Sequence, residues 1–544
     1  MNARFWLSTV VCIIAALVLM PLFIVGASVF SIDTNLWGHL LDTVFTEYVL
    51  NSLLLALGVG TGTIVIGTYL AYTMVNYAFW GKSLLTWLVL LPLAMPAYII
   101  AYTYTGLLDF SGPVQSMLRE AFGWERADYW FWDVRSLSGA IVMMILVLYP
   151  YVYILARSAF AEQSHSFNKV SQLAGYSRFE HVRRVSLPLA RPAILTGASL
   201  AMMESLADYG TVAYFGVSTF STGIFRTWFG MGSVQGAAQL STVLCMFVLV
   251  LLVLEKHSRK DASRYQSRQA ASVKPKQLSG IAGIGLFLLC LAPAVFGFII
   301  PFIQLTAWSF KFAEVGDLGD FVSLIQNSLT LAALGALIIV VFATAVSYCK
   351  RLTQQSPSKV PIKSIEQALS LGYALPGIVI AVGVLIMAGW SDRQINLFTM
   401  AWFDYRPGLI ISGGMTILIF AYAVRFISVA LQNTETGFMR IPPKLDQAAL
   451  SLSGSYRHLL SKIQLPLLSA SLISALLLVF VDILKELPAT LVLRPFNFNT
   501  LAVRAYELAS DERLIDAALP AISIVLVGLL PVVLLTRQLN KAST

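Results

Sequence analysis

The chain has 544 residues, of which 57% are hydrophobic and 12% charged, with a formal net charge of +9 and a mean hydropathy of +0.76. Soluble domains carry about 25% charged residues, and half that fraction excludes a fold that faces water on all sides. Apolar runs of about 20 residues recur along the whole length, and such runs predict membrane-spanning helices. A helix satisfies its own backbone hydrogen bonds in the bilayer. The predicted fold class is therefore an all-α polytopic membrane protein.

Twelve apolar segments can be marked in chain order, and each predicts one transmembrane helix. They cover residues 5–30, 50–75, 84–108, 137–157, 189–213, 237–255, 280–307, 327–349, 366–390, 408–431, 467–490 and 515–536. The first segment is longer than the apolar core of a secretory signal, which runs about 7–15 residues, so we expect a retained helix. The four cysteines, Cys12, Cys245, Cys290 and Cys349, lie in or beside these apolar runs and suggest neither a disulfide framework nor a zinc site.

Lysine and arginine gather in the even-numbered loops and in the linker after segment six. The loops around 31–49 and 311–326 are mainly acidic. The positive-inside rule then places both termini and the even-numbered loops in the cytoplasm. This distribution explains the positive net charge without a nucleic-acid partner.

The two halves of the sequence repeat with an offset of about 278 residues. Asn51-Ser52-Leu53 recurs as Asn327-Ser328-Leu329, and Pro96 is echoed by Pro376. Six segments per repeat make the two copies run in the same sense, related by an axis along the membrane normal. The expected organisation is a first helix and loop (1–46), a first transmembrane domain (47–255), a basic linker (256–279), helix seven with its loop (280–322), a second transmembrane domain (323–537) and a tail (538–544).

Each half carries one polar, basic, helix-prone loop, at residues 168–188 and 446–466. In the second, Pro442-Pro443 begins a helix and Asp446 adds negative charge to its first turn. Ser453-Gly454 breaks this helix, and a second one from Tyr456 to Ile463 is expected to end before Leu465-Pro466, because proline cannot continue it. The first loop has the same plan, with its turn at Gly175. A single loop of this kind could be an ordinary interfacial helix, but two copies at matching positions weaken that interpretation.

The second loop resembles the EAA loop of ABC importer permeases, whose pattern is Glu-Ala-Ala, three residues, Gly, nine residues, Ile, any residue, Leu-Pro. Both glutamates are missing, the second copy has its glycine one place later at Gly454, and the first copy lacks both alanines. The resemblance implies that the loops dock on ATP-binding subunits and pass their motion into segments five and eleven. The residues assigned to this coupling are Gly175, Arg178, Arg183, Leu187, Pro188, Gln447, Ala448, Ala449, Ser453, Gly454, Ile463, Leu465 and Pro466.

Ionisable residues stand inside segments five and eleven at matching positions, and a lone charge there costs about 2.5–3.5 kcal/mol. Asp482, Lys485 and Glu486 share one helix face by spacing, so Lys485 can pair with either carboxylate. Two compatible interpretations are open: an ion network that joins helices, or the lining or gate of a polar pathway. The pathway set is Glu204, Asp208, Asp482, Lys485, Glu486 and the helix-breaking Pro488.

The stretch Lys485–Ala502 looks like the corresponding part of fused iron(III) importer permeases, and Leu206–Gly216 is similar to their first-half counterpart. The resemblance implies the type I ABC importer fold in a bacterial inner membrane, with no cofactor. It also implies ferric iron delivered by a periplasmic binding protein, two copies of a cytoplasmic ATPase, and contact with membrane lipid. Thiamine permeases share this plan, so thiamine or another small solute stays an alternative.

Enzymatic function is not expected. Gly81-Lys82-Ser83 resembles the end of a phosphate-binding loop, but the first glycine of that motif would fall on Asn76. The five histidines are dispersed, and no nucleophile–base arrangement stands out. The rival from another class is a proton-coupled secondary transporter that uses the intramembrane carboxylates as proton carriers. That model leaves the paired loops unexplained.

Overall fold

The computed structural model describes residues 2–31, 34–161, 163, 176–260, 275–315, 318–354, 365, 368–369, 372, 374–453 and 455–541. Within these residues, eleven helices are long and apolar enough to cross a membrane. A bent pair, Lys82–Ala94 and Ala97–Phe122, turns by 94° and gives a twelfth span if counted as one. The only strands in the described ranges are β1 (Tyr77–Ala78) and β2 (Lys276–Gln277), which pair in parallel. The predicted all-α membrane fold is confirmed.

The chain divides into two compact units, and each combines segments from both sequence halves. Unit 1 comprises Met1–Trp37, Ile224–Thr242 and Asp317–Arg504. Unit 2 comprises Gly38–Gly223, Val243–Gly316 and Ala505–Thr544.

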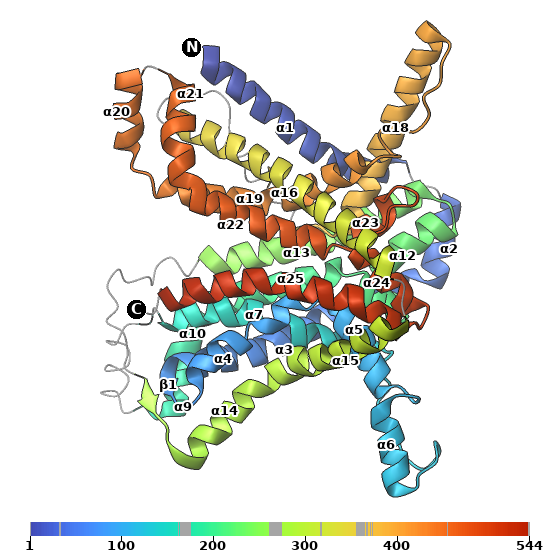
Figure 1. The fold of residues 1–544 in the computed structure, drawn as a ribbon, viewed down its shortest axis with the longest axis vertical. Coiled ribbons are helices and arrows are strands. Elements are labelled where there is room, and N and C mark those ends of the chain that lie inside the picture. Colours follow the sequence, from blue (N-terminus) through green and yellow to red (C-terminus); the bar gives the residue numbers. More distant parts are fainter. Residues whose placement is uncertain are drawn as a thin grey trace. The chain divides into compact units, whose positions relative to one another are not determined.

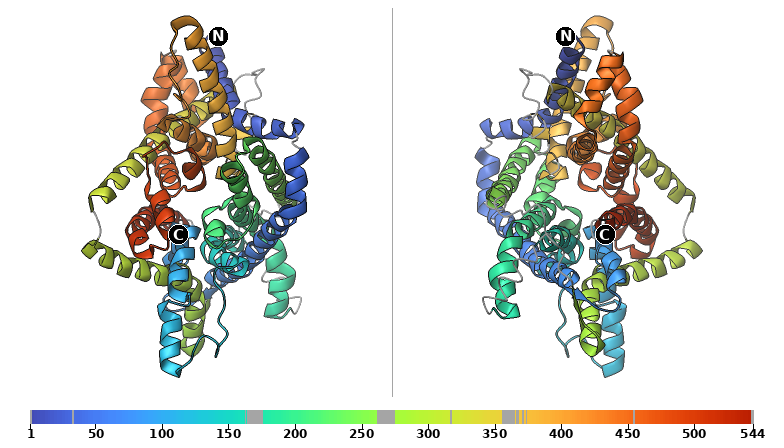
Figure 2. Two further views of the ribbon diagram at one scale, coloured as in Figure 1. Left: turned by 90° about the vertical axis from the view of Figure 1, so that its right-hand side faces the viewer. Right: turned by 90° about the vertical axis from the view of Figure 1, so that its left-hand side faces the viewer.

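Unit 1 is built around α16 (Leu318–Gln354), α19 (Met415–Met439) and α22 (Leu465–Leu484), which pack against one another. The N-terminal helix α1 (Asn2–Ala27) lies against α16 and α18 (Gly377–Phe403) of this bundle (Figures 1 and 2). The first helix of the chain therefore completes a bundle made mostly from the second half.

Unit 2 is built around α3 (Phe45–Asn76), α7 (Leu137–Ala161) and α10 (Leu187–Ala207). The leading helices of the second half, α14 (Gly280–Ala294) and α15 (Ile300–Val315), pack here against α4 (Lys82–Leu88), α5 (Ala97–Leu108) and α25 (Leu514–Lys541). The remaining helices of the two units are α2 (Thr34–Thr43), α6 (Pro113–Phe122), α9 (Arg178–His181), α11 (Gly210–Tyr214), α12 (Phe220–Phe225), α13 (Val234–Lys260), α20 (Pro443–Ser453), α21 (Tyr456–His458), α23 (Pro488–Leu493) and α24 (Leu501–Ser510).

The sequence repeat has a structural counterpart in each unit. Ser52 Oγ accepts a hydrogen bond from the Phe220 backbone N–H at 3.1 Å, and Ser328 Oγ accepts one from Leu501 at 2.8 Å. The offset is constant along the core helices: α7 and α19 begin at 137 and 415, α10 and α22 at 187 and 465, and α11 and α23 at 210 and 488, each a difference of 278. The serine of the repeated Asn-Ser motif accepts a hydrogen bond from a backbone N–H group in both copies.

Segment nine, expected at 366–390, is interrupted before Gly377. Residues 368–369 are helical, and α18 begins at Gly377, directly after Pro376, and continues to Phe403. Proline disfavours helical geometry in the residue before it, which explains why α18 begins only after Pro376. Pro96 precedes α5 in the same way.

Candidate functional site

The second predicted loop, residues 446–466, contains two helices, α20 and α21, as expected, but its exit differs from the prediction. The short α21 passes into a π-helical turn, Leu459–Gln464, and then into α22 without a break. Pro466 stands in the first turn of α22, where a missing N–H is tolerated. The expectation that Leu465-Pro466 ends the helix was wrong, because the wider π turn carries the chain past the proline.

The first loop has the same exit. Its described part is α9, a π-helical turn at Val182–Ser186, and α10, with Pro188 in the first turn. Ser177 and Glu180 cap α9 reciprocally, since Ser177 N–H donates to Glu180 Oε2 at 3.0 Å and Glu180 N–H donates to Ser177 Oγ at 3.3 Å. Gly175 and Gly454, the predicted turn glycines, lie outside the described residues.

The predicted coupling residues include both buried and exposed side chains. Ala449 is buried, and Ile463, Leu465 and Leu187 are partly buried. The exposed members are Arg183, Pro188, Gln447, Ala448 and Pro466. Arg178 and Ser453 lie in α9 and α20.

Two large apolar side chains on these loops escaped the sequence analysis. Leu452 of α20 is 90% exposed, and Phe179 of α9 is 73% exposed. Exposed apolar side chains mark a protein–protein or membrane interaction site when they form a contiguous patch rimmed by polar residues. The signal available from sequence was a large apolar residue within each otherwise polar loop.

Of the two carboxylates that the sequence offers to Lys485, Asp482 is its ion-pair partner. The helix α22 ends at Leu484, and Lys485 pairs with Asp482 at 2.9 Å. Glu486 instead contacts Arg425 of α19, with Oε1 and Nη1 2.8 Å apart. Sequence reasoning missed Arg425, which stands alone in segment ten.

The matched carboxylates Asp208 and Glu486 have the same local role. Asp208 accepts from the backbone N–H groups of Thr211 at 2.9 Å and Val212 at 3.3 Å, at the start of α11. Glu486 accepts from those of Ala489 at 3.1 Å and Thr490 at 3.0 Å, at the start of α23. Each carboxylate caps a short helix at a break in the membrane segment, which satisfies N–H groups that lipid could not.

The halves differ in charge balance around these caps. With the 278-residue offset, Arg425 corresponds to Val147 and Lys485 to Ala207. Across the described ranges, neither Glu204 nor Asp208 forms an ion pair with a basic side chain, whereas Asp482 and Glu486 both do. The acidic pair of the first half is therefore not neutralised in this way.

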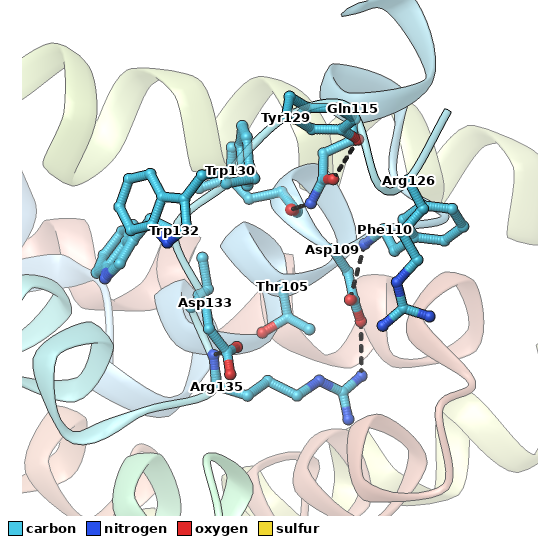
Figure 3. A pocket seen from close by; sticks show the side chains of 13 residues that line it. Thr105, Asp109, Phe110, Gln115, Arg126, Tyr129, Trp130, Trp132, Asp133 and Arg135 are labelled. Carbon is cyan, nitrogen blue, oxygen red and sulfur yellow. Dashed lines mark hydrogen bonds and ion pairs between the residues drawn. The ribbon is translucent and has the colours of Figure 1, made fainter. Parts of the chain in front are cut away.

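Unit 2 also holds a cavity of about 350 Å³ beside α6 (Figure 3). Its lining comes from Thr105, Leu108, Asp109, Phe110, Gln115, Arg126, Tyr129, Trp130, Phe131, Trp132, Asp133, Val134 and Arg135. Arg135 pairs with Asp109 at 3.2 Å and with Glu512 at 3.1 Å, and the Tyr129 hydroxyl donates to Gln115 Oε1 at 2.7 Å. The wall is thus a polar network under aromatic rings, of which Trp130 is 86% exposed.

The helix α6, beside the cavity, and the helix α9 lie at opposite ends of unit 2 (Figure 1). The 25 residues of α7 separate them, a length of about 37 Å at 1.5 Å per residue. Sequence reasoning overlooked the cavity, although five aromatic residues between Trp124 and Trp132 gave a signal.

No group of three or more His, Cys, Asp or Glu side chains suited to hold a metal ion occurs in the described part of the chain.

Comparison with known proteins gives a consistent family. Residues 63–254 match the model of the binding-protein-dependent transport system inner membrane component. The Fe(3+)-transport system permease protein FbpB 2 of Haemophilus influenzae is 25% identical over 99% of both chains. A putative ferric transport system permease protein, FbpB 1, of the same organism is 24% identical over 87% of this chain and 74% of its own length.

A shorter relative matches only part of the chain. The molybdenum transport system permease protein ModB of Haemophilus influenzae is 24% identical over 34% of this chain and 79% of its own length. One such protein thus corresponds to less than one half of this sequence, as a fused repeat requires. The apolar spans indicate a multi-pass membrane protein, and the chain is similar to permeases of binding-protein-dependent ABC importers, with the family model matched over residues 63–254.

Proposed function

We propose that this chain is the permease of an ABC importer for ferric iron. The proposed substrate rests on how much of the chain each relative matches. The relative matched over 99% of both chains is a Fe(3+)-transport permease. The molybdenum relative matches only one third of the chain. The chain itself is not an enzyme in this proposal, and ATP is hydrolysed by the partner subunit.

Two copies of the ATPase bind the two loops from the cytoplasm, and both termini lie on that side. Support comes from the Lys/Arg distribution and from the exposed Leu452 and Phe179, one anchor on each loop. Because each loop continues into α10 or α22 through a π turn, a movement of the docked ATPase reaches the membrane helix without a flexible joint. The coupling residues named from sequence keep this role in the proposal.

The substrate path is lined or gated by the intramembrane charged residues. The unneutralised Glu204 and Asp208 supply the attraction for a cation, and the paired Asp482, Lys485 and Glu486 shape the second half. Pro488 begins α23, directly after the capped break. A trivalent cation in a low-dielectric path needs a compensating negative charge, which the first half offers.

The loaded binding protein docks at the end of unit 2 that carries the cavity. Exposed Trp130 beside Arg126 and Tyr129 matches the residue types that dominate protein–protein hot spots. In the proposed orientation this end faces the periplasm.

Reconstitution tests the proposal. Proteoliposomes contain the permease with its ATPase, with ATP inside and ferric-loaded binding protein outside, and no ion gradient is imposed. Uptake of radioactive iron that requires ATP supports the proposal, whereas uptake driven by a proton gradient alone contradicts it. Binding proteins loaded with thiamine or molybdate serve as substrate controls.

A further inference from the structure

One buried polar cluster holds the second coupling loop in place. Asp446 of α20 is 0% exposed. Its Oδ2 lies 2.6 Å from Arg351 Nε of α16, and its Oδ1 accepts from Gln464 Nε2 at 2.9 Å. Gln464 is the last residue of the π turn before α22. Arg351, Asp446 and Gln464, named here the loop lock, thus join the coupling helix to two membrane helices.

Arg351 also holds a third membrane helix. Its Nη1 and Nη2 donate to the backbone carbonyls of Phe438, in α19, and Ile441, just beyond it. These carbonyls belong to the end of a helix, where such groups lack partners within the helix. The hydrogen bonds of the Arg351 guanidinium therefore join Asp446 in α20 to the segment of chain that leads from α19 into the loop.

An apolar cluster surrounds the loop lock. Tyr348, Leu352, Phe438, Ile441, Ala449, Leu459 and Leu468 are buried together, and the Tyr348 hydroxyl donates to the Tyr456 carbonyl at 2.8 Å. Removal of one partner from a buried ion pair leaves the other charge uncompensated, so the geometry of α20 depends on both. Two contacts from α16 consequently hold the two sides of the loop.

The corresponding positions of the first half carry no such charges. Subtracting the offset of 278 from residues 351, 446 and 464 gives Thr73, Asn168 and Ser186. Both ionic members are thus replaced by neutral residues. Asn168 lies outside the described residues.

We propose that Arg351 and Asp446 are positioning residues which clamp the second coupling loop to α16, α19 and α22, and that the two ATPase contacts of this permease are therefore mechanically unequal. The inference rests on the proposed docking of ATPase on these loops. It places the transmission of ATPase movement in the second half on three membrane helices, rather than on α22 alone. The positions of this clamp that match in the first half, Thr73, Asn168 and Ser186, carry no charge.

The test compares Asp446→Asn with a matched control on the same helix. Lys350→Gln removes the neighbouring ion pair, in which Lys350 Nζ lies 2.6 Å from Glu435. This pair joins α16 to α19. Both variants lose one ion pair of α16, and only Asp446→Asn loses the pair between Arg351 and Asp446 of α20.

The first readout does not depend on transport. Amide hydrogen exchange of residues 443–453 is measured in the full-length purified permease. We expect Asp446→Asn to accelerate exchange by about tenfold or more, because the helix loses its buried anchor, while Lys350→Gln leaves it close to the parent. Equal exchange in Asp446→Asn and the parent overturns the proposed clamp.

The second readout is the number of ions taken up per ATP hydrolysed in the reconstituted importer. Asp446→Asn should lower this ratio by about threefold or more, with ATPase still bound. Arg351→Gln should do the same, and Lys350→Gln should not. An unchanged ratio in Asp446→Asn, or an equal fall in Lys350→Gln, overturns the positioning role. If the parent shows no ATP-dependent uptake, the proposed function fails, whereas the exchange experiment still decides whether the clamp exists.

Discussion

The guanidinium of Arg425 lies 2.8 Å from the carboxylate of Glu486, and these residues are only 9% and 5% exposed. The pair joins α19 to the break between α22 and α23, where Glu486 also caps α23. It is an ion pair inside a membrane segment, at a position where the first half has Val147. Substitutions of Arg425 and of the adjacent Gly377 test how much this ion pair contributes to stability.

Replacing Arg425 with Gln should destabilise the protein by about 3–5 kcal/mol, since it leaves Glu486 buried without its counter-charge. Thermal unfolding of the purified permease in detergent measures this. Lys485→Gln is the control, because Lys485 and Asp482 are more exposed, and exposed pairs contribute about 0–1 kcal/mol. An equal loss of stability in both variants contradicts the assignment.

Gly377 makes room for the same pair. A Cβ there would collide with the Arg425 guanidinium and lie 2.6 Å from Glu486 Oε1. We expect Gly377→Ala to cost about 1–3 kcal/mol through overpacking, measured by the same unfolding assay. Gly389→Ala, on the same helix with open space at its Cβ, should leave stability unchanged or slightly raised; a comparable loss there would argue against a local clash.

Pro466 and the π turn before it should matter for coupling rather than for insertion. Replacement by Ala restores a backbone N–H and favours an ordinary α-helix, which would rotate α20 relative to α22. We expect Pro466→Ala, alone or with Gly454→Ala, to lower iron uptake per ATP several-fold at normal membrane levels. Leu467→Ala, an exposed neighbour, is the control. Unchanged uptake in the proline variant would count against the coupling role.

Charge removal in the path should affect uptake and spare docking. Asp208→Asn retains a cap acceptor for α11 while it removes the charge, and Glu204→Gln removes the second one. The double variant should lower uptake by about tenfold or more, because electrostatic attraction of a cation is lost. Co-purification of the ATPase is the control measurement. Lost co-purification would mean that these residues only hold helices together, and the same assays apply to Asp208→Asn combined with Glu486→Gln.

Trp130 should be an anchor for the binding protein. Truncation of a hot-spot aromatic costs about 2 kcal/mol or more, so Trp130→Ala should weaken binding of the loaded binding protein roughly 30-fold. Surface plasmon resonance on permease in nanodiscs measures the affinity. Trp80→Ala, which removes a similarly exposed ring beside β1, should bind like the parent. Equal binding by both variants would exclude the cavity as the docking site.

The sequence by itself determined the class, the number of spans and the repeat. Hydropathy records which stretches can enter a bilayer, and the constant offset of 278 records the duplication. It also located both polar loops, because polar helix formers between apolar runs are a local signal. These inferences needed no knowledge of what any side chain touches.

Only the tertiary structure decided which charged side chains pair with each other. Periodicity allowed Lys485 to pair with Glu486, but the end of α22 at Leu484 removes the helical spacing on which that inference rested. Arg425 is 61 residues from Glu486 in sequence, and Arg351 is 95 residues from Asp446. Which distant cation reaches a buried carboxylate depends on how helices pack. The same holds for α1, whose hydropathy predicts a span but not its place against α16 and α18.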